Sequence, residues 1–218
     1  MRTIFIALLM VAPGFLHAGV IFDVAGISDP TLMSTVEFSY SPGTGIIDIA
    51  IHNTSLVPPN SDPRVTSFAF NVPDNVTGLS AFTGPADWAG WFDRDNMNTP
   101  NQLGLFDLAG LTGANFNGGS PNDGIPASST FDFQFVLSGS NLGLLTEASF
   151  LGLPSAEEAG GGTAPQYFAV RFQRTGPNGD RSDVGIPTSV PEPSTLVSLG
   201  VALAGVAWLR RRSKPAVQ

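Results

Sequence analysis

Residues 130–137 read Thr-Phe-Asp-Phe-Gln-Phe-Val-Leu, and this stretch decides the fold that we expect. Apolar side chains recur at every second position, and the polar Asp132 and Gln134 lie between them. Because successive side chains of an extended strand point to opposite faces, this period of two predicts a strand with one buried face. The side chains on that face are Phe131, Phe133, Phe135 and Leu137.

Further stretches with the same alternation follow one another along the chain, and clusters of Gly, Pro, Asn and Asp separate them. Many one-sided strands between such turns are typical of an antiparallel β-sandwich, with phenylalanines filling the space between its sheets. The fold class that we predict is therefore mainly β, in a domain over residues 19–174. Residues 175–189 are rich in Gly, Pro and Ser and are predicted to be a linker. The other candidate strands are residues 20–24, 33–40, 46–52, 64–72 and 166–173.

The composition of the chain excludes several classes of function. None of its 218 residues is Cys, which removes disulfides, thiolate zinc sites and cysteine nucleophiles. Residues 19–190 contain 17 acidic residues, five Arg and no Lys, which gives a net charge of −12. Nucleic acid is not an expected partner, because phosphate binding requires a basic surface. The lack of Lys in this region also excludes a phosphate-binding loop and a Schiff base.

No catalytic residue, metal ligand or cofactor is predicted. Residues 19–190 hold one histidine, His52, and no G-x-S-x-G motif that could supply a nucleophile for it. Carboxyl groups are numerous, but no pair stands out as the acid and base of a glycosidase. Residues 93–98 and 117–124 have the oxygen-rich composition of calcium loops. Neither has the spacing of an EF-hand, so solvated turns are the favoured interpretation.

The stretch Trp-Ala-Gly-Trp-Phe over residues 88–92 is the aromatic cluster with the best prospect of binding a ligand. Exposed Trp88 and Trp91 could stack on sugar rings, which would make the domain a carbohydrate-binding module. The alternative, which we favour, is that Trp88 and Phe92 fill the end of the sandwich, because large aromatic side chains are mostly buried.

The N-terminus has the pattern of a secretory signal peptide over residues 1–18. Arg2 is followed by an almost wholly apolar run of 13 residues, 3–15, which is too short for a comfortable membrane span. A small residue then marks a cleavage site between Ala18 and Gly19. We therefore expect a short signal-peptide helix that is removed on export.

The C-terminus predicts a single transmembrane helix. Residues 193–209 carry no charge, and their 17 positions are at the lower limit needed to cross a bilayer. With cations outside both apolar segments, both termini should start in the cytoplasm, and the acidic middle should be carried across the membrane. The cations that stop the C-terminal segment in the cytoplasm are Arg210, Arg211, Arg212 and Lys214.

The C-terminal segment, residues 190–214, resembles the PEP-CTERM sorting signal, which has a Pro-Glu-Pro strip, an apolar helix and a cluster of arginines in this order. The resemblance implies that the secretion machinery exports the chain and that a membrane-embedded exosortase then recognises and processes it. Hosts of this signal are typically Gram-negative bacteria that make extracellular polysaccharide. Two prolines also prevent a regular helix around the glutamate, which leaves an extended strip for the enzyme. The residues of the strip are Val190, Pro191, Glu192 and Pro193.

Together these features predict a non-enzymatic exported protein of the cell surface or extracellular matrix. Its precursor should be anchored in the inner membrane by the C-terminal helix before it reaches the surface. A carbohydrate-binding module for extracellular polysaccharide is the alternative hypothesis, and a secreted hydrolase is the third.

Overall fold

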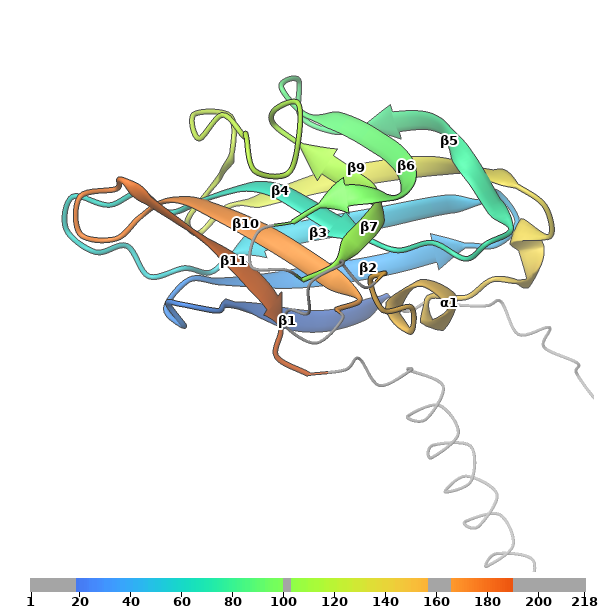
Figure 1. Cartoon of the computed structure of the whole chain (residues 1–218), viewed down its shortest axis with the longest axis horizontal. Helices are drawn as coiled ribbons and strands as arrows, with labels where there is room; N and C mark the ends of the chain where they lie inside the picture. The colour runs from blue at the N-terminus through green and yellow to red at the C-terminus, as the bar shows by residue number, and fades with distance from the viewer. Residues whose placement is uncertain (1–18, 100–102, 157–165, 190–218) are drawn as a thin grey trace, which may run out of the picture.

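The computed structural model describes residues 19–99, 103–156 and 166–189, which form an antiparallel β fold (Figure 1). Each stretch that alternation predicts as a strand is one, and five further strands accompany them. A short 3₁₀ helix, η2 (Leu142–Leu144), and a one-turn helix, α1 (Ala148–Leu151), follow β9. The strands are β1 (Val20–Gly26), β2 (Met33–Ser41), β3 (Ile46–Asn53), β4 (Arg64–Phe70), β5 (Val76–Thr83), β6 (Ala89–Asn98), β7 (Leu105–Leu111), β8 (Ile125–Pro126), β9 (Thr130–Gly139), β10 (Phe168–Thr175) and β11 (Arg181–Pro187).

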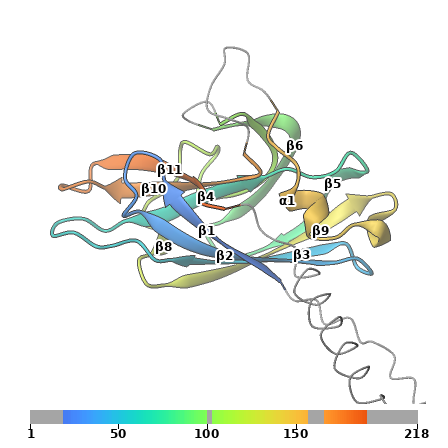
Figure 2. The same ribbon diagram turned by 90° about the horizontal axis from the view of Figure 1, so that it is seen from below.

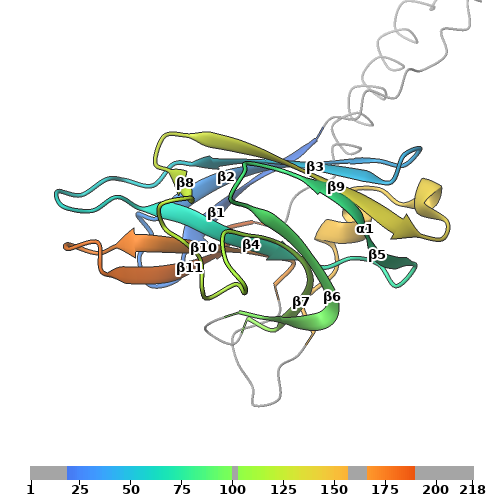
Figure 3. The same cartoon turned by 90° about the horizontal axis from the view of Figure 1, so that it is seen from above.

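All the strands belong to one sheet. Its order is β5-β9-β3-β2-β1-β11-β10-β4-β7-β6, and β8 pairs with β4. The two halves of this order lie face to face, and the pairing of β1 with β11 joins them (Figure 3). At the two ends of the order, β5 and β6 meet so closely that a Cβ on Gly90 would lie 2.7 Å from the side chain of Phe82. A mainly β, antiparallel fold is therefore confirmed, but its two layers are parts of one continuous sheet rather than the separate sheets that we predicted.

The linker predicted over residues 175–189 is wrong, because residues 181–187 form β11 in the middle of the sheet order. β11 pairs with β10 on one side and with β1 on the other. Asp183 is buried in this strand, and its carboxylate accepts hydrogen bonds from the backbone N–H groups of Ser28 and Asp29, each at 2.9 Å. Hydrogen bonds to a charged acceptor are the stronger ones, so they tie the turn between β1 and β2 to β11.

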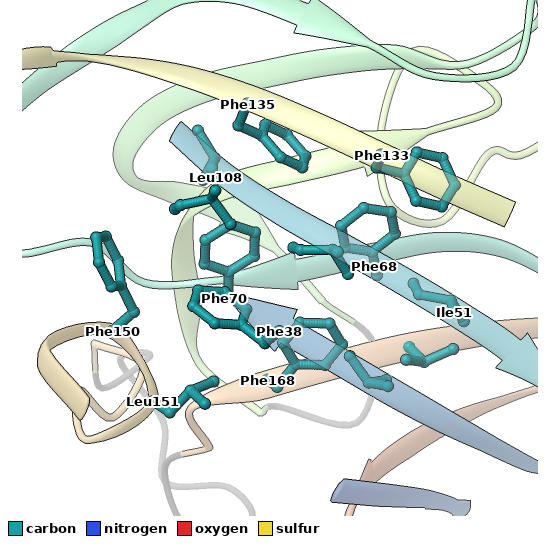
Figure 4. Packing of buried hydrophobic residues seen from close by; sticks show 14 of the residues in the cluster. Phe38, Ile51, Phe68, Phe70, Leu108, Phe133, Phe135, Phe150, Leu151 and Phe168 are labelled. Atoms are coloured by element: carbon teal, nitrogen blue, oxygen red, sulfur yellow. The ribbon is translucent and has the colours of Figure 1, made fainter. Parts of the chain in front are cut away.

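Aromatic side chains from the two layers meet in the core (Figure 4). The ring centroid of Phe68, on β4, lies 4.8 Å from that of Phe133 and 6.0 Å from that of Phe135, both on β9. Phe168, on the neighbouring β10, stacks on Phe68 with a centroid distance of 6.0 Å. Edge-to-face and offset contacts at these distances are favourable beyond the burial of the rings. The prediction that phenylalanines fill the space between the layers is confirmed.

The helical turns close one end of this core (Figure 2). Phe150 of α1 is fully buried, with its ring centroid 5.8 Å from that of Phe38 and 4.9 Å from that of Tyr40, both on β2. The hydroxyl of Tyr40 donates to the backbone carbonyl of Leu142 at 2.8 Å. The polar tip of this buried ring is thereby satisfied, as buried polar groups require.

A smaller apolar cluster lies on the other side of β4 and β7, beneath the loop of residues 112–124. Phe116 of this loop is fully buried in the cluster together with Ala69 and Ala109. The hydroxyl of Ser67 donates to the carbonyl of Phe116 at 2.8 Å and holds the loop in place. Because the loop covers the outer face of the sheet here, β4 is buried on both sides instead of in alternation.

Candidate functional sites

Trp88 and Trp91 do not form one ligand site, because they belong to different apolar clusters on opposite faces of the sheet. Trp88 is only 6% exposed, and its ring centroid lies 4.7 Å from that of Phe133. Its indole N–H donates to the backbone carbonyl of Asp123 at 2.9 Å. The favoured interpretation, that Trp88 fills the end of the core, is therefore confirmed, and the alternative that Trp88 contacts a glycan is wrong. The physical reason is that residues three positions apart on an extended chain point to opposite faces of the sheet, as Trp88 and Trp91 do.

Trp91 packs partly on the outer cluster and also lines a surface groove of about 320 Å³. Strand β6 supplies one wall of this groove, and the loop of residues 112–124 supplies the other. An aromatic face among amide groups, each of which both donates and accepts hydrogen bonds, matches the surface of a sugar. The amide side chains are those of Asn96, Asn98, Asn115 and Asn117.

Both walls of the groove include a segment for which the composition predicted solvated turns. The prediction is wrong for residues 93–98, which form part of β6. The side-chain oxygen of Asn115 accepts hydrogen bonds from the backbone N–H groups of Asn117 and Gly118, at 3.0 and 2.7 Å. These bonds make a turn that presents the loop to Trp91. The oxygen-rich composition of both segments was visible in the sequence, but their proximity to one tryptophan was not.

A second groove, of about 450 Å³, lies on the outer face of β2, β3 and β9 and is acidic. Its carboxyl groups are Glu37, Asp48 and Asp132, of which Asp48 accepts a hydrogen bond from the Gln134 amide at 2.8 Å. In residues 19–99, 103–156 and 166–189, no three His, Asp or Glu side chains are placed together to hold a metal ion. At the edge of this face, His52 shares a hydrogen bond of 2.9 Å with the hydroxyl of Thr130.

The chain leaves the folded domain beside β1. Because β1 runs antiparallel to β11, β11 runs toward the start of β1, and it ends at Pro187, opposite Val24. The backbone N–H of Thr188 donates to the carbonyl of Asp23 at 2.9 Å, and the hydroxyl of Tyr167 donates to the carbonyl of Ser189 at 2.5 Å. Burial raises the pKa of Tyr167, so this hydroxyl keeps its proton. The domain therefore holds the chain as far as Ser189.

The termini predicted from the sequence lie outside the described residues. These are the signal peptide with Ala18, the strip of residues 190–193, and the cations of residues 210–214. Gly19 is described and precedes β1 directly. No helix within the described part of the chain has the length and apolar character needed to span a membrane. The helix predicted to do so falls in residues that the structure does not describe.

Comparison with protein families explains the C-terminal segment. Residues 189–212 match the family model of the PEP-CTERM protein-sorting motif. The chain is a PEP-CTERM sorting-signal protein. It is thus exported and sorted during secretion, and its signal implies processing by an exosortase. No curated protein and no solved structure matches the chain.

The PEP-CTERM motif follows the folded domain with no linker between them. Its match begins at Ser189, the residue whose carbonyl Tyr167 holds, and β11 ends only at Pro187. The Pro-Glu-Pro sequence therefore starts at Pro191, two residues beyond Ser189. An enzyme that acts on the strip must work close to the surface formed by the start of β1 and the end of β11.

Proposed function

We propose that this PEP-CTERM protein is a non-enzymatic component of the cell surface or extracellular matrix of a Gram-negative bacterium. The signal peptide directs its export, and the C-terminal helix anchors the precursor in the inner membrane. An exosortase then processes the chain at the Pro-Glu-Pro strip and passes the β domain to the surface. The observation that carries this proposal is the match of residues 189–212 to the sorting motif, directly behind a folded domain.

The geometry of the domain supports this arrangement. The chain leaves the domain beside β1, so one side can be held at a membrane while the clefts on the rest of the surface stay accessible. The region between the termini has a net charge of −12 and no Lys, so it offers little attraction to anionic lipid headgroups. We therefore expect the C-terminal segment, and not the domain, to contact the membrane.

Site-directed labelling tests the proposal, and the absence of Cys makes each introduced thiol the sole target. Ser80→Cys places a thiol on an exposed position of β5, and Ser213→Cys places one among the C-terminal cations. On intact cells with an active exosortase, a membrane-impermeant maleimide should label Ser80→Cys and leave Ser213→Cys unlabelled. In cells without the exosortase, Ser80→Cys should become labelled only after the outer membrane is opened.

Two labelling results would contradict the proposal. If the Ser80→Cys variant stays unlabelled on intact cells that have the exosortase, the domain does not reach the surface. Labelling of Ser213→Cys on those cells would show that the cationic end crosses the membrane. Detection of both variants by antibody in cell extracts controls for their expression.

A second function, carbohydrate binding, is favoured by the groove at Trp91. The half-buried indole is held on the outer apolar cluster, and amide side chains surround it from two elements. Ligand sites commonly combine an apolar surface with a few convergent polar groups in this way. The ligand would be a neutral segment of extracellular polysaccharide.

Replacing the ring tests this second function. Trp91→Ala should weaken binding of the purified protein to neutral polysaccharide by about tenfold or more, because a tryptophan anchor commonly supplies that much. Affinity electrophoresis in gels that contain the polysaccharide measures the change. Ile21→Ala is the control, since Ile21 is an apolar side chain of β1 that is 63% exposed. Equal retardation of Trp91→Ala and the unsubstituted protein would rule out a site at this groove.

A further inference from the structure

Three of the five arginines of residues 19–190 line one cleft, of about 260 Å³. The cleft lies along the β10–β11 hairpin, and Pro121 of the loop of residues 112–124 forms part of its edge. The arginines are Arg171, Arg174 and Arg181, and a single carboxyl group, Asp180, shares the lining with them. In a region that has no Lys and a net charge of −12, this is a local concentration of positive charge.

A β-bulge brings neighbouring residues of β10 into the cleft. Gln173 and Arg174 would face opposite sides of a regular strand, but the pairing of β10 with β11 shifts between Gln173 and Thr175. Arg174 has a φ of 56°, an uncommon conformation for a residue with a side chain. Its guanidinium is held by the Asp62 carboxylate at 3.4 Å and by the side-chain oxygen of Asn122 at 2.5 Å. Backbone strain of this kind persists where the surroundings enforce it, often at functional sites.

Two polar atoms on the cleft-lining residues have no hydrogen-bond partner within the described part of the chain. Arg171 donates from Nη2 to the hydroxyl of Ser182 at 3.0 Å, but its buried Nε has no acceptor there. The buried Oε1 of Gln173 has no donor there. Because buried polar atoms are nearly always paired, we expect the side chains of Arg171 and Gln173 to turn when a ligand enters, so that the ligand presents an acceptor to one atom and a donor to the other.

The positive charges of these arginines also favour an anionic ligand in the cleft. Neither Arg171 nor Arg181 makes an ion pair with any described residue, whereas Arg174 is paired with Asp62. Burial lowers the pKa of Arg171, and the charge of Asp183 opposes that shift only in part. An anion in the cleft would offset the cost of burying this guanidinium.

We propose that the cleft binds the carboxylate of a hydroxylated acid, and that a uronic acid residue of a polysaccharide is the class of ligand. The planar guanidinium groups match a carboxylate, which they can grip with two parallel hydrogen bonds. A sugar hydroxyl supplies the donor that the Gln173 oxygen requires. A neutral sugar lacks the anion, and sulfate at neutral pH has no proton to donate. This site is separate from the Trp91 groove and goes beyond the sorting function.

Calorimetric titration of the full chain in detergent tests the proposal with three probes. These are a trimer of galacturonic acid, the matching neutral trimer of galactose, and inorganic sulfate. The galacturonate trimer should bind, and Arg171→Gln and Arg181→Gln should each weaken that binding by about tenfold or more. Gln173→Glu should abolish it, because the new carboxylate would repel the ligand. The neutral trimer and sulfate should bind far more weakly.

A matched variant separates the cleft from net charge. Ser80→Glu changes the charge of the protein by the same amount as Arg181→Gln, but on exposed β5 at the end of the sheet order. It should bind the galacturonate trimer as the unsubstituted protein does. Because Arg181 is exposed, Arg181→Gln should keep its thermal unfolding midpoint even if Arg171→Gln does not.

Several results would overturn the proposal. Unchanged binding in Arg181→Gln, or an equal loss in Ser80→Glu, would show that the cleft arginines do not hold the ligand. Equal affinity for the neutral trimer would remove the role of the carboxylate. Sulfate binding as tight as that of the galacturonate trimer would remove the role of the hydroxyl and of Gln173.

Discussion

Phe68→Ala should lower the free energy of unfolding by about 3–5 kcal/mol, the range typical of a large aromatic ring removed from a packed core. The Phe68 side chain is fully buried on β4, where it joins the two layers. The backbone of β7 lies directly against it, since a Cβ on Gly110 would be 2.4 Å from the ring. Paired strands on both sides keep the cavity from collapsing. The aromatic rings that Phe68 contacts are those of Trp88, Phe133, Phe135 and Phe168.

Urea unfolding followed by tryptophan fluorescence measures this change. Ile21→Ala is the control, because truncation of an exposed side chain should alter the unfolding free energy by less than about 0.5 kcal/mol. A loss below about 1 kcal/mol for Phe68→Ala would contradict the packing of the two layers around this ring.

Replacing the strip with alanines, as Pro191→Ala, Glu192→Ala and Pro193→Ala in one chain, should reduce processing by about tenfold or more. Alanine removes the carboxylate and also permits a helix where the prolines keep the backbone extended. The precursor should then accumulate in the membrane fraction. Immunoblots that separate precursor from processed chain measure the ratio of the two.

Prolines elsewhere provide the control for this variant. Pro58→Ala with Pro59→Ala changes two exposed prolines of the loop before β4 and should leave processing unchanged. Normal processing of the triple-alanine chain would show that the strip is not what the exosortase recognises. Slowed processing of both chains would show that the effect comes from the domain.

The strands that alternation reveals are those with one face in the core. The strand over residues 130–137 was predicted from the alternation of its apolar and polar residues. That alternation exists because Phe133, Phe135 and Leu137 are buried while Asp132 faces outward. β7 shows no alternation, because the loop of residues 112–124 covers its outer side. A period of two disappears when both faces are buried. Sequence alone therefore could not place this strand.

β6 and β11 were missed for a different reason, which is that polar residues conceal them. β6 contains a run of Asp, Arg and Asn and is bulged between Phe92 and Met97. β11 begins with Arg-Ser-Asp, in which Asp183 is buried because backbone N–H groups of another turn satisfy it. Such a partner is distant in sequence, so composition indicated a linker.

The candidate sites were predictable only in part. Trp91 was identified as a residue that could contact a ligand, but its proximity to Asn115 and Asn117 depends on the loop that folds back over β7. Arg171 and Arg181 are ten positions apart and meet only because β10 and β11 form a hairpin. In contrast, the sorting motif is a linear pattern, and the sequence alone was enough to predict it.

Mass spectrometry of both chain ends tests the central claim most directly, with protein isolated from cells that have the exosortase and from cells that lack it. In both, the chain should begin at Gly19. In cells with the enzyme it should have lost residues 210–218, and in cells without it those residues should remain. A chain that keeps residues 210–218 in the presence of the active enzyme would contradict sorting through the PEP-CTERM motif.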